Sequence, residues 1–446
     1  MTLKNDRRTL FGWCMYDWAN SAFATTVLAA LLPAYFAGEV VGPQGVMIGG
    51  TLYSATTLWG FVVGLAALLI FLTAPFLGAI ADFSAAKKRF LLTFAYGGSI
   101  FTLLLFFCRS GDVFKTLIFF LLAQIGFIAA NVFYDAFLPQ ITTPDKIDWL
   151  SGKGFAFGYL GGGLQFALTL GLVAGHAQLG LSQSLAARIG IALAGVWWAG
   201  FTLFTLKYLR EAPRKDPLPA QYREKASIVA YGAMGFSRLL QTARQVGRFK
   251  HLLLFLIAFM LYNDGIQTVI NMATIYGKEE LRLTTTQLMI TLLIIQVIAI
   301  VGALSFSRLA KYIGAKRAVM VTLVLWSGVV VYGYFIQTAT EYFILGVVVG
   351  IVLGGSQALS RSLYGSMIPE NASAEFYGFY SVFSKFSAIW GPLAFALIRQ
   401  ISGSARLSIV SLMVFFIAGL ILLAFVDETK AREAKLGDPI GAQPLR

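Results

Sequence analysis

Twelve apolar stretches of about 20 residues each run along this chain, and they constrain its fold more than any other feature. A stretch of that length crosses the hydrocarbon core of a bilayer as one helix. Charged residues make up only 13% of the chain, well below the ~25% typical of soluble domains, so we expect no separate soluble domain. The sequence predicts an all-α integral membrane protein with twelve transmembrane helices. The predicted spans are residues 16–38, 52–81, 90–108, 116–138, 154–175, 185–208, 251–276, 286–306, 318–337, 342–365, 376–400 and 407–426.

The basic residues predict the orientation of these helices. With both termini in the cytoplasm, about 26 of the 35 Lys and Arg residues fall on the cytoplasmic side, as the positive-inside rule requires. This distribution accounts for the net charge of +14 without a nucleic-acid partner. The stretch 209–250 reads as a cytoplasmic linker with an amphipathic helix that rests on anionic headgroups, or alternatively as a regulatory partner site.

The two halves of the chain resemble each other. "GAIADFSAAKKR" at 78–89 aligns with "SRLAKYIGAKR" at 307–317, and "YDWANSAF" in the first span aligns with "YNDGIQTV" in the seventh. We therefore predict an N-terminal half (1–208), the linker, a C-terminal half (251–426) and a cytoplasmic tail (427–446). Two six-helix halves related by a pseudo-two-fold axis along the membrane normal are typical of secondary transporters, which bind solute between the halves. A monomer suffices for this arrangement.

The loop "GAIADFSAAKKR" resembles the loop signature of the major facilitator superfamily. The motifs "YDWANSAF", "GYLGGG", "NDGIQT", "GGSQALSRSLYGSMIP" and "FYGFYSVFSKFSAIWGPL" together resemble the branch of fungal autophagy-related vacuolar amino-acid effluxers and their uncharacterised bacterial relatives. This resemblance implies a major facilitator fold and a cavity lined by helices one, four, seven and ten. The compact loops suggest a bacterial inner membrane, with an organelle membrane as the alternative. The resemblance also implies a cytoplasmic latch made by Gly78, Asp82, Lys87, Lys88 and Arg89. The chain departs from the loop signature at Phe83, where arginine is common, and at Ala85, where glycine is common.

Polar residues sort by helix in a way that supports a cavity. The third, sixth, ninth and twelfth helices carry no acid or base in their apolar cores, as lipid exposure demands. In "GYLGGG" (158–163), the glycines favour a close helix crossing over a substrate contact. We expect Tyr134 and Trp390 to be the aromatic residues of the cavity. The predicted solute-binding residues are Asn20, Asn131, Tyr134, Asn263, Asp264, Gln267, Gln357, Arg361, Lys385 and Trp390.

Charged residues inside the spans predict ion pairs between the halves. Asp17 and Asp135 should face Arg361, and Asp264 should lie near Lys385; such pairs either gate transport or are purely structural. Three acids face two bases, and a buried carboxylate without a partner takes up a proton more readily. One of Asp17, Asp135 and Asp264 is therefore predicted to exchange a proton during transport, with Asp264 the first choice because of its depth.

Other classes of protein fit the sequence less well. It contains no phosphate-binding GxxxxGK[ST] loop, and two histidines are too few for a histidine-based metal or haem site. We expect no enzymatic activity, no catalytic or metal-binding residues and no cofactor, with a proton or sodium gradient as the driving force. The predicted function is alternating-access transport of a small polar solute, with amino-acid efflux favoured. A drug, a sugar or a lipid-like metabolite as the solute, and a non-transporting receptor, are the alternatives.

Overall fold

The computed structural model describes residues 4–211, 249–387 and 390–436. Within these ranges, twelve helical stretches are long and apolar enough to cross a membrane, and they match the twelve predicted spans. The predicted amphipathic helix of the linker falls on residues that lie outside the described ranges. The protein is thus an all-α, multi-pass membrane protein.

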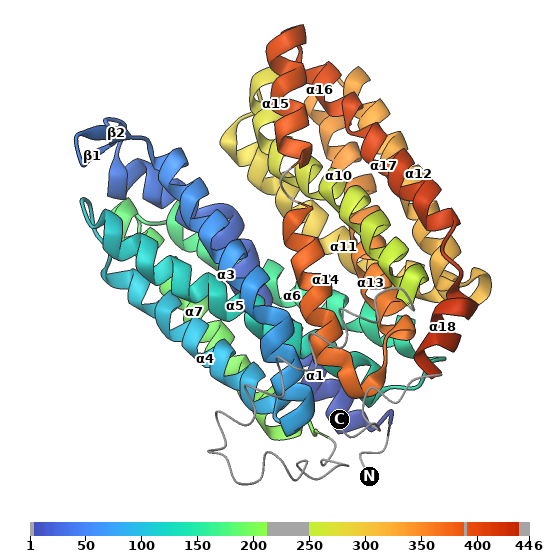
Figure 1. The fold of residues 1–446 in the computed structure, drawn as a ribbon. Helices are drawn as coiled ribbons and strands as arrows, with labels where there is room; N and C mark the ends of the chain where they lie inside the picture. Colours follow the sequence, from blue (N-terminus) through green and yellow to red (C-terminus); the bar gives the residue numbers. More distant parts are fainter. Residues whose placement is uncertain (1–3, 212–248, 388–389, 437–446) are drawn as a thin grey trace.

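The first six spans form one half of the molecule (Figure 1). They are α1 (Arg7–Ala22) continued by η1 (Phe23–Leu31), α2 (Leu32–Tyr35) and η2 (Phe36–Val41), then α3 (Ala55–Ser84), α4 (Lys87–Leu104) with η3 (Leu105–Phe107), α5 (Val113–Ile141), α6 (Ile147–Ala174) and α7 (Gln183–Tyr208). A short antiparallel hairpin, β1 (Val46–Ile48) and β2 (Thr51–Tyr53), joins the first two spans.

The last six spans form the other half. They are α10 (Lys250–Glu280), α11 (Thr285–Ile313), α12 (Ala315–Phe335), α13 (Ala339–Met367), then η5 (Glu370–Ala372) with α14 (Ser373–Phe386) and α15 (Trp390–Ser402), and finally α16 (Ala405–Ser411) with α17 (Met413–Ala424). The described residues of the eleventh span form α14 and α15, on either side of residues 388–389, which lie outside the described ranges. A further helix, α18 (Glu428–Leu436), follows the last span.

Several helices begin at the side-chain caps that a sequence can reveal. Asp6 accepts the amide N–H of Thr9 at the start of α1, and Thr284 and Thr338 each form a capping box at the start of α11 and α13. The Asp6 cap moves the start of the first span to Arg7, nine residues before the predicted boundary. Asp17 therefore lies about three turns inside the helix rather than in its first turn.

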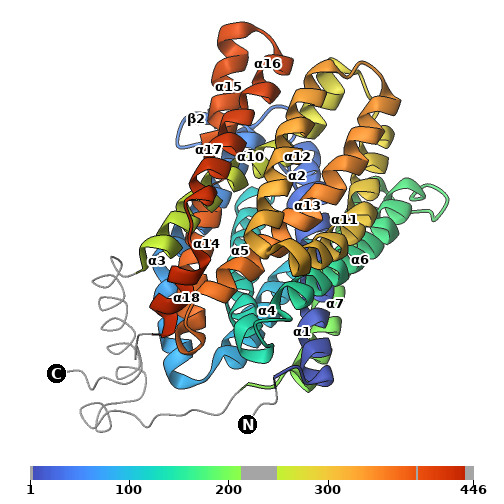
Figure 2. The same cartoon turned by 90° about the vertical axis from the view of Figure 1, so that its right-hand side faces the viewer.

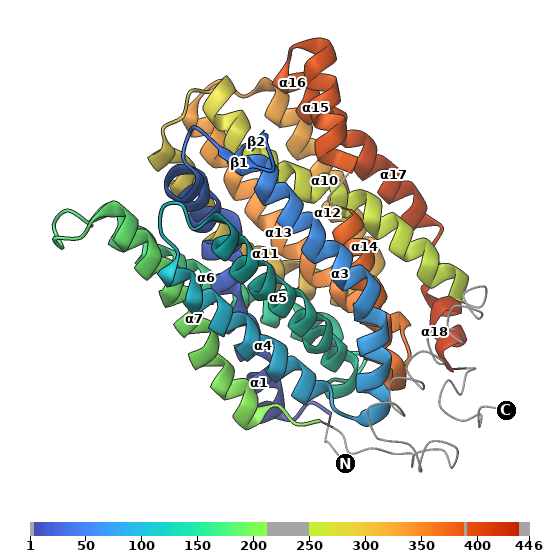
Figure 3. The same cartoon turned by 60° about the vertical axis from the view of Figure 1, so that its left-hand side comes forward.

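Two helix pairs hold the halves together. Figure 3 shows α3 beside α14, and Figure 2 shows α6 beside α11. In each pair the backbones approach closely because one helix presents a glycine. A Cβ on Gly78 of α3 would lie 2.3 Å from the carbonyl oxygen of Ala374, and one on Gly152 of α6 would lie 2.7 Å from that of Ala303.

The outer and inner layers follow the predicted order. α4 and α7 lie on the outer flank of one half, and α12 and α17 on that of the other (Figure 1). In the most apolar stretch of α5, α10 and α13, 56%, 56% and 61% of the residues are buried, against 33% for α4 and 39% for α7, although the first span, at 33%, is no more buried than α4. The predicted glycine crossing is confirmed, because a Cβ on Gly161 would lie 2.4 Å from the carbonyl oxygen of Trp18 in α1.

Both ends of the described chain lie at one end of the bundle, which we call the terminal side (Figure 1). Here Lys4 forms an ion pair with Glu370 at 2.7 Å, and Gln140 donates to the Glu370 carbonyl oxygen at 2.8 Å, so the halves touch. Away from the terminal side the ribbons of the two halves diverge. The conformation is closed at the terminal side.

Candidate functional site

A cavity of about 470 Å³ lies between the halves, and we call it the central cavity. It is lined from one half by α1, η1, α5 and α6, and from the other mainly by α10, α11, α12 and α13. Its lining residues with polar side chains are Asp17, Asn20, Ser21, Thr25, Asn131, Tyr134, Asp135, Tyr159, Tyr276, Thr291, Gln296, Tyr342, Gln357 and Arg361. Most of its apolar lining comes from the C-terminal half, so the cavity has a polar part and an apolar wall.

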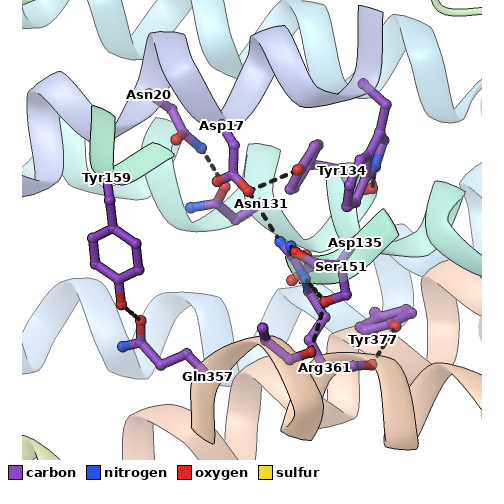
Figure 4. A network of polar contacts seen from close by, with 12 residues as sticks. Asp17, Asn20, Asn131, Tyr134, Asp135, Ser151, Tyr159, Gln357, Arg361 and Tyr377 are labelled. Atoms are coloured by element: carbon purple, nitrogen blue, oxygen red, sulfur yellow. Dashed lines mark hydrogen bonds and ion pairs between the residues drawn. The ribbon is translucent and has the colours of Figure 1, made fainter. Parts of the chain in front are cut away.

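Arg361 on α13 reaches across the interface into the N-terminal half (Figure 4). Its Nη1 donates to Asp17 Oδ2 at 3.3 Å and to Asp135 Oδ1 at 3.2 Å. Its Nε donates to the Ser151 hydroxyl at 3.0 Å, and its Nη2 to the Ser151 carbonyl oxygen at 2.9 Å. The predicted pairing of Arg361 with both acids is confirmed. All the acceptors of this guanidinium come from the opposite half, so they join the halves through a single side chain.

Aromatic rings pack around the same guanidinium. Its carbon lies 4.0 Å from the ring centroid of Phe155, 4.9 Å from that of Trp13 and 5.4 Å from that of Tyr134. Cation–π attraction is strongest where water is excluded, and Arg361 is only 4% exposed. Trp13 is itself fixed, because its indole N–H donates to the Tyr134 carbonyl oxygen at 2.8 Å. The rings leave little room for any other position of the guanidinium.

The two acids of the cluster differ in their partners. Asp17 Oδ2 accepts the Tyr134 hydroxyl at 2.8 Å in addition to Arg361. Among the described residues, Arg361 is the one hydrogen-bond donor to the Asp135 side chain. With both acids ionised, the cluster carries two negative charges and one positive charge. Asp135 is therefore the less stabilised of the two carboxylates.

Amide and hydroxyl groups continue the polar surface away from Arg361 (Figure 4). Asn20 donates to the Asn131 side-chain oxygen at 2.6 Å, and the Tyr159 hydroxyl donates to Gln357 at 2.6 Å. The second contact joins α6 to α13 and so crosses between the halves. Asn20, Asn131, Tyr134 and Gln357 thus lie on the cavity, as the sequence predicted.

The first helix changes its hydrogen-bonding pattern beside the cavity. Residues Phe23–Leu31 form a π-helix, η1, whose wider turns line the cavity with Ala24, Thr25, Ala29 and Ala30. Stretches of π-helix are rare and are frequently found at functional sites. Thr26 on the other face donates to Gln165 of α6, which ties this stretch to the rest of the half. The sequence analysis did not predict the π-helix.

The seventh and eleventh helices differ from the prediction. Asn263, Asp264, Gln267, Lys385 and Trp390 are not among the described residues that line the central cavity. Asn263 donates to Ser387, and Trp390 is 59% exposed. The aromatic role of Trp390 in the cavity stays a prediction.

The predicted ion pair of Asp264 with Lys385 is wrong. Asp264 Oδ1 accepts the backbone N–H of Gly391 at 2.9 Å at the start of α15, and within the described ranges Lys385 forms no ion pair. Gly391 lies in the first described turn of α15, and a carboxylate is a strong cap for a backbone N–H group that has no partner within its helix. Asp264 is thus a cap supplied by a neighbouring helix.

The predicted latch is present at the terminal side in part. Asp82 forms a buried ion pair with Lys87 at 2.6 Å, and its Oδ2 accepts the backbone N–H of Glu375 at 2.8 Å. It thus caps α14 of the other half, where the helix dipole favours an acid. Lys88 instead donates to the Leu206 carbonyl oxygen, and the Arg89 side chain is exposed.

The chain after α7 secures the helix that carries Lys87. The Glu211 carboxylate accepts the backbone N–H groups of Lys87 at 2.8 Å and Lys88 at 3.0 Å, in the first turn of α4. Burial raises the pKa of this carboxyl above its ordinary value, and the two hydrogen bonds only partly oppose that change. This contact holds the start of α4 and so positions Lys87 towards Asp82.

Three residues that hold Arg361 were missed in the sequence. Ser151 and Phe155 precede the polar and glycine-rich positions of the fifth span, and Trp13 precedes the predicted start of the first. A serine or an aromatic residue in a transmembrane helix carries no signal of its own, because both are common there. Only the cap at Asp6, which places Trp13 inside the helix, could have drawn attention to it.

Fold and site together define a class of protein. Two six-helix halves, a polar cavity between them and charged contacts that cross the interface at one end are the parts of a transporter that works by alternating access. The structure of the human organic anion transporter MFSD10 has the same fold, with a TM-score of 0.68 and 14% identity over 94% of this chain and 100% of that one.

Sequence comparison narrows the class to a family. The family model described as "Vacuole effluxer Atg22 like" matches residues 5–148 and 142–436. The uncharacterized MFS-type transporter YxiO of Bacillus subtilis is 32% identical over 93% of this chain and 94% of its own length. Autophagy-related protein 22 of Coccidioides immitis is 24% identical over 97% and 89%. The chain belongs to the Atg22-like family of the major facilitator superfamily and is a transporter.

Proposed function

We propose that this protein is a proton-coupled exporter of zwitterionic amino acids with apolar side chains. The observation that carries the proposal is the division of the central cavity into a charged cluster around Arg361 and an apolar wall. The efflux direction is supported by the description of the matching family model. In this proposal the protein works as a monomer in a bacterial inner membrane, with the terminal side in the cytoplasm.

The charged cluster suits the two ends of a zwitterion. Arg361 is the cation that would take the carboxylate, since a guanidinium binds carboxylates through paired hydrogen bonds. Asp17 and Asp135 would take the ammonium group, and the Asn20 and Asn131 amides lie within the same polar surface. An incoming carboxylate competes with the two aspartates for Arg361. Binding therefore loosens the contact that joins the halves.

The apolar wall suits a hydrocarbon side chain. Val269 and Ile270 of α10 and Val349 and Leu353 of α13 line the cavity from the C-terminal half. Each methylene group that moves from water to such a wall contributes about 0.8 kcal/mol. This preference selects amino acids with aliphatic or aromatic side chains over glycine or serine.

The net charge of the cluster changes when one proton binds, and this change couples transport to the proton gradient. With one proton bound, the two acids and Arg361 are neutral together, and without it they carry one net negative charge. We assign the proton to Asp135, the acid with fewer hydrogen-bond donors, instead of the first choice, Asp264, whose carboxylate caps α15. A proton on Asp135 removes one of the two anionic acceptors of Arg361 and so favours separation of the halves at the terminal side.

The latch has a supporting role in this cycle. Asp82 and Lys87 would stabilise the conformation that is closed at the terminal side, because Asp82 caps α14 only while the two halves touch. When the halves separate, Asp82 loses the Glu375 N–H but keeps Lys87, which belongs to its own half.

The proposal is tested by flux in proteoliposomes. A panel of radiolabelled amino acids is assayed with and without an imposed pH gradient, beside vesicles that carry an Arg361→Ala variant. Protein-dependent flux of leucine- or phenylalanine-like solutes that increases with the gradient supports the proposal. Flux of sugars or organic anions only, with no amino-acid flux, would keep the transporter and remove this substrate.

A further inference from the structure

A second cavity, of about 820 Å³, lies at the terminal side between the halves. Its walls are the start of α1, the segment from α5 to α6, the turn between α11 and α12, the end of α13 and α18. It is lined by charges of both signs, which require water or a polar occupant. These charged residues are Arg7, Lys146, Lys311 and Arg432, with Asp145, Asp148 and Glu428.

The second cavity lies close to the central cavity along three helices that line both. On each of these helices the two cavities are five to seven residues apart, which is about 7 to 11 Å along the axis. The nearest lining residues are Leu10 and Asp17 on α1, Trp149 and Phe155 on α6, and Ser366 and Arg361 on α13. A partition of this thickness holds one layer of side chains.

That layer is the Arg361 cluster. Trp13 and Ser151 lie between the two sets of lining residues on α1 and α6. Ser151 accepts two hydrogen bonds from Arg361, and Trp13 stacks on its guanidinium. The contacts that join the halves through Arg361 therefore also separate the two cavities.

At the terminal side, the interface between the halves has two edges, one formed by α3 and α14 and the other by α6 and α11, and these edges differ. On the side of α3 and α14, Asp82 caps a helix of the other half and Gly78 meets the backbone of Ala374. On the side of α6 and α11, the residue at the position of Asp82 in the sequence repeat is Lys311, which lines the second cavity. One side is latched, and the other already holds a polar space.

We propose that the second cavity is the terminal-side vestibule of the transport route and that cargo crosses the Arg361 cluster to or from it on the side of α6 and α11. The proposal rests on the proposed function for the identity of the cargo. The vestibule is suited to a zwitterion, because a carboxylate finds Lys311 there and an ammonium group finds Asp148, whereas Arg432 is already paired with Glu428 at 3.2 Å. The location proposed for the vestibule does not depend on the identity of the cargo.

Single-cysteine variants test the proposal in two ways. The background is C14A/C108A, since both natural cysteines are buried. In the flux assay, Lys311→Cys and Ser366→Cys line the vestibule, and Tyr312→Cys, next to Lys311 but 82% exposed and outside the lining, is the matched control. Modification with a bulky maleimide should abolish flux at the first two positions and leave the control unchanged. Unchanged flux at all three would overturn the proposal.

The second test needs no flux. Ser21→Cys lies on the central cavity and should react with a membrane-impermeant thiosulfonate only from the side opposite the termini. Addition of Arg361→Ala removes the partition and should open the same cysteine to reagent from the terminal side. Reaction from the opposite side, retained in both proteins, shows that the variant is folded.

The outcomes of the two proposals are distinguishable. If Ser21→Cys in the Arg361→Ala protein does not react with reagent from the terminal side, cargo does not pass through this layer and the proposal of a vestibule is wrong. If the unmodified protein shows no amino-acid flux, the proposed function fails, and the accessibility of Ser21→Cys still decides the vestibule.

Discussion

Arg361 Nη1 lies 3.2 Å from Asp135 Oδ1, although the two residues are 226 positions apart and belong to opposite halves. A buried guanidinium is stable only while its acceptors surround it, and here the acceptors come from the half that must move away. The contact is therefore both a structural requirement of this conformation and an obstacle to the next one. Several measurable consequences arise from this relationship.

Arg361→Ala should destabilise the protein and abolish flux. The substitution leaves Asp17 and Asp135 buried without a cation, and the loss of one partner of a buried pair typically costs about 3–5 kcal/mol. Thermal unfolding in detergent measures the loss. The triple variant D17N/D135N/R361A should recover much of the stability and none of the flux. No recovery would show that the stacking on Trp13 and Phe155, rather than charge, holds this region together.

Asp135→Asn should uncouple transport from the pH gradient. The amide mimics the protonated acid, so exchange of cargo across vesicles at equal pH should persist while stimulation by the gradient disappears. Asp17→Asn is the control, because Asp17 also holds the Tyr134 hydroxyl and should instead weaken cargo binding. If stimulation by the gradient survives Asp135→Asn and is lost with Asp17→Asn, then Asp17 exchanges the proton and Asp135 binds the cargo.

Asp264→Asn should retain dependence on the pH gradient, because the residue caps a helix and lies away from the cavity lining. Its measurable effect should be a loss of stability, of about 0.5–2 kcal/mol for Asp264→Ala and less for the amide, which keeps one acceptor. The unfolding temperatures of both variants, with flux at two gradients, separate the roles. Loss of gradient dependence with unchanged stability would show that Asp264 is the residue that exchanges the proton.

Gly78→Ala should disfavour the conformation that is closed at the terminal side. The new Cβ would lie 2.3 Å from the Ala374 carbonyl oxygen, and backbone cannot move aside as a flexible side chain can. Gly64→Ala, on the same helix with open space around it, is the matched control. Terminal-side labelling of Ser21→Cys should increase with Gly78→Ala alone. Equal labelling in both variants would contradict the close approach.

Ala85→Gly should stabilise the loop that carries Asp82. Ala85 has a φ of +48° at the end of α3, a left-handed conformation that costs a residue with a Cβ about 1–2 kcal/mol. The neighbouring Ala86 has a φ of −120°, so Ala86→Gly gains nothing from glycine and serves as the control. A higher unfolding temperature for Ala85→Gly only is expected. Equal shifts would mean that the strain is absent.

Much of the architecture was predictable from the sequence because the properties that carry it are local. A run of apolar residues long enough for the bilayer must be a helix, whatever surrounds it. Repeated motifs predicted two similar halves, and the helices without charges in their cores predicted the outer layer. The pairing of Arg361 with Asp17 and Asp135 was also predictable, since a buried cation needs an anionic partner at similar depth.

The tertiary structure decided which direction each side chain faces. Asp264 and Lys385 lie at similar depth, yet the Asp264 carboxylate meets the backbone N–H of Gly391 in α15. Ser151 and Trp13 became part of the Arg361 cluster only where α1, α6 and α13 converge. Sequence determines the depth of a residue through its distance along a helix. Its neighbours depend on helix rotation and crossing, which only the packing of the whole bundle establishes.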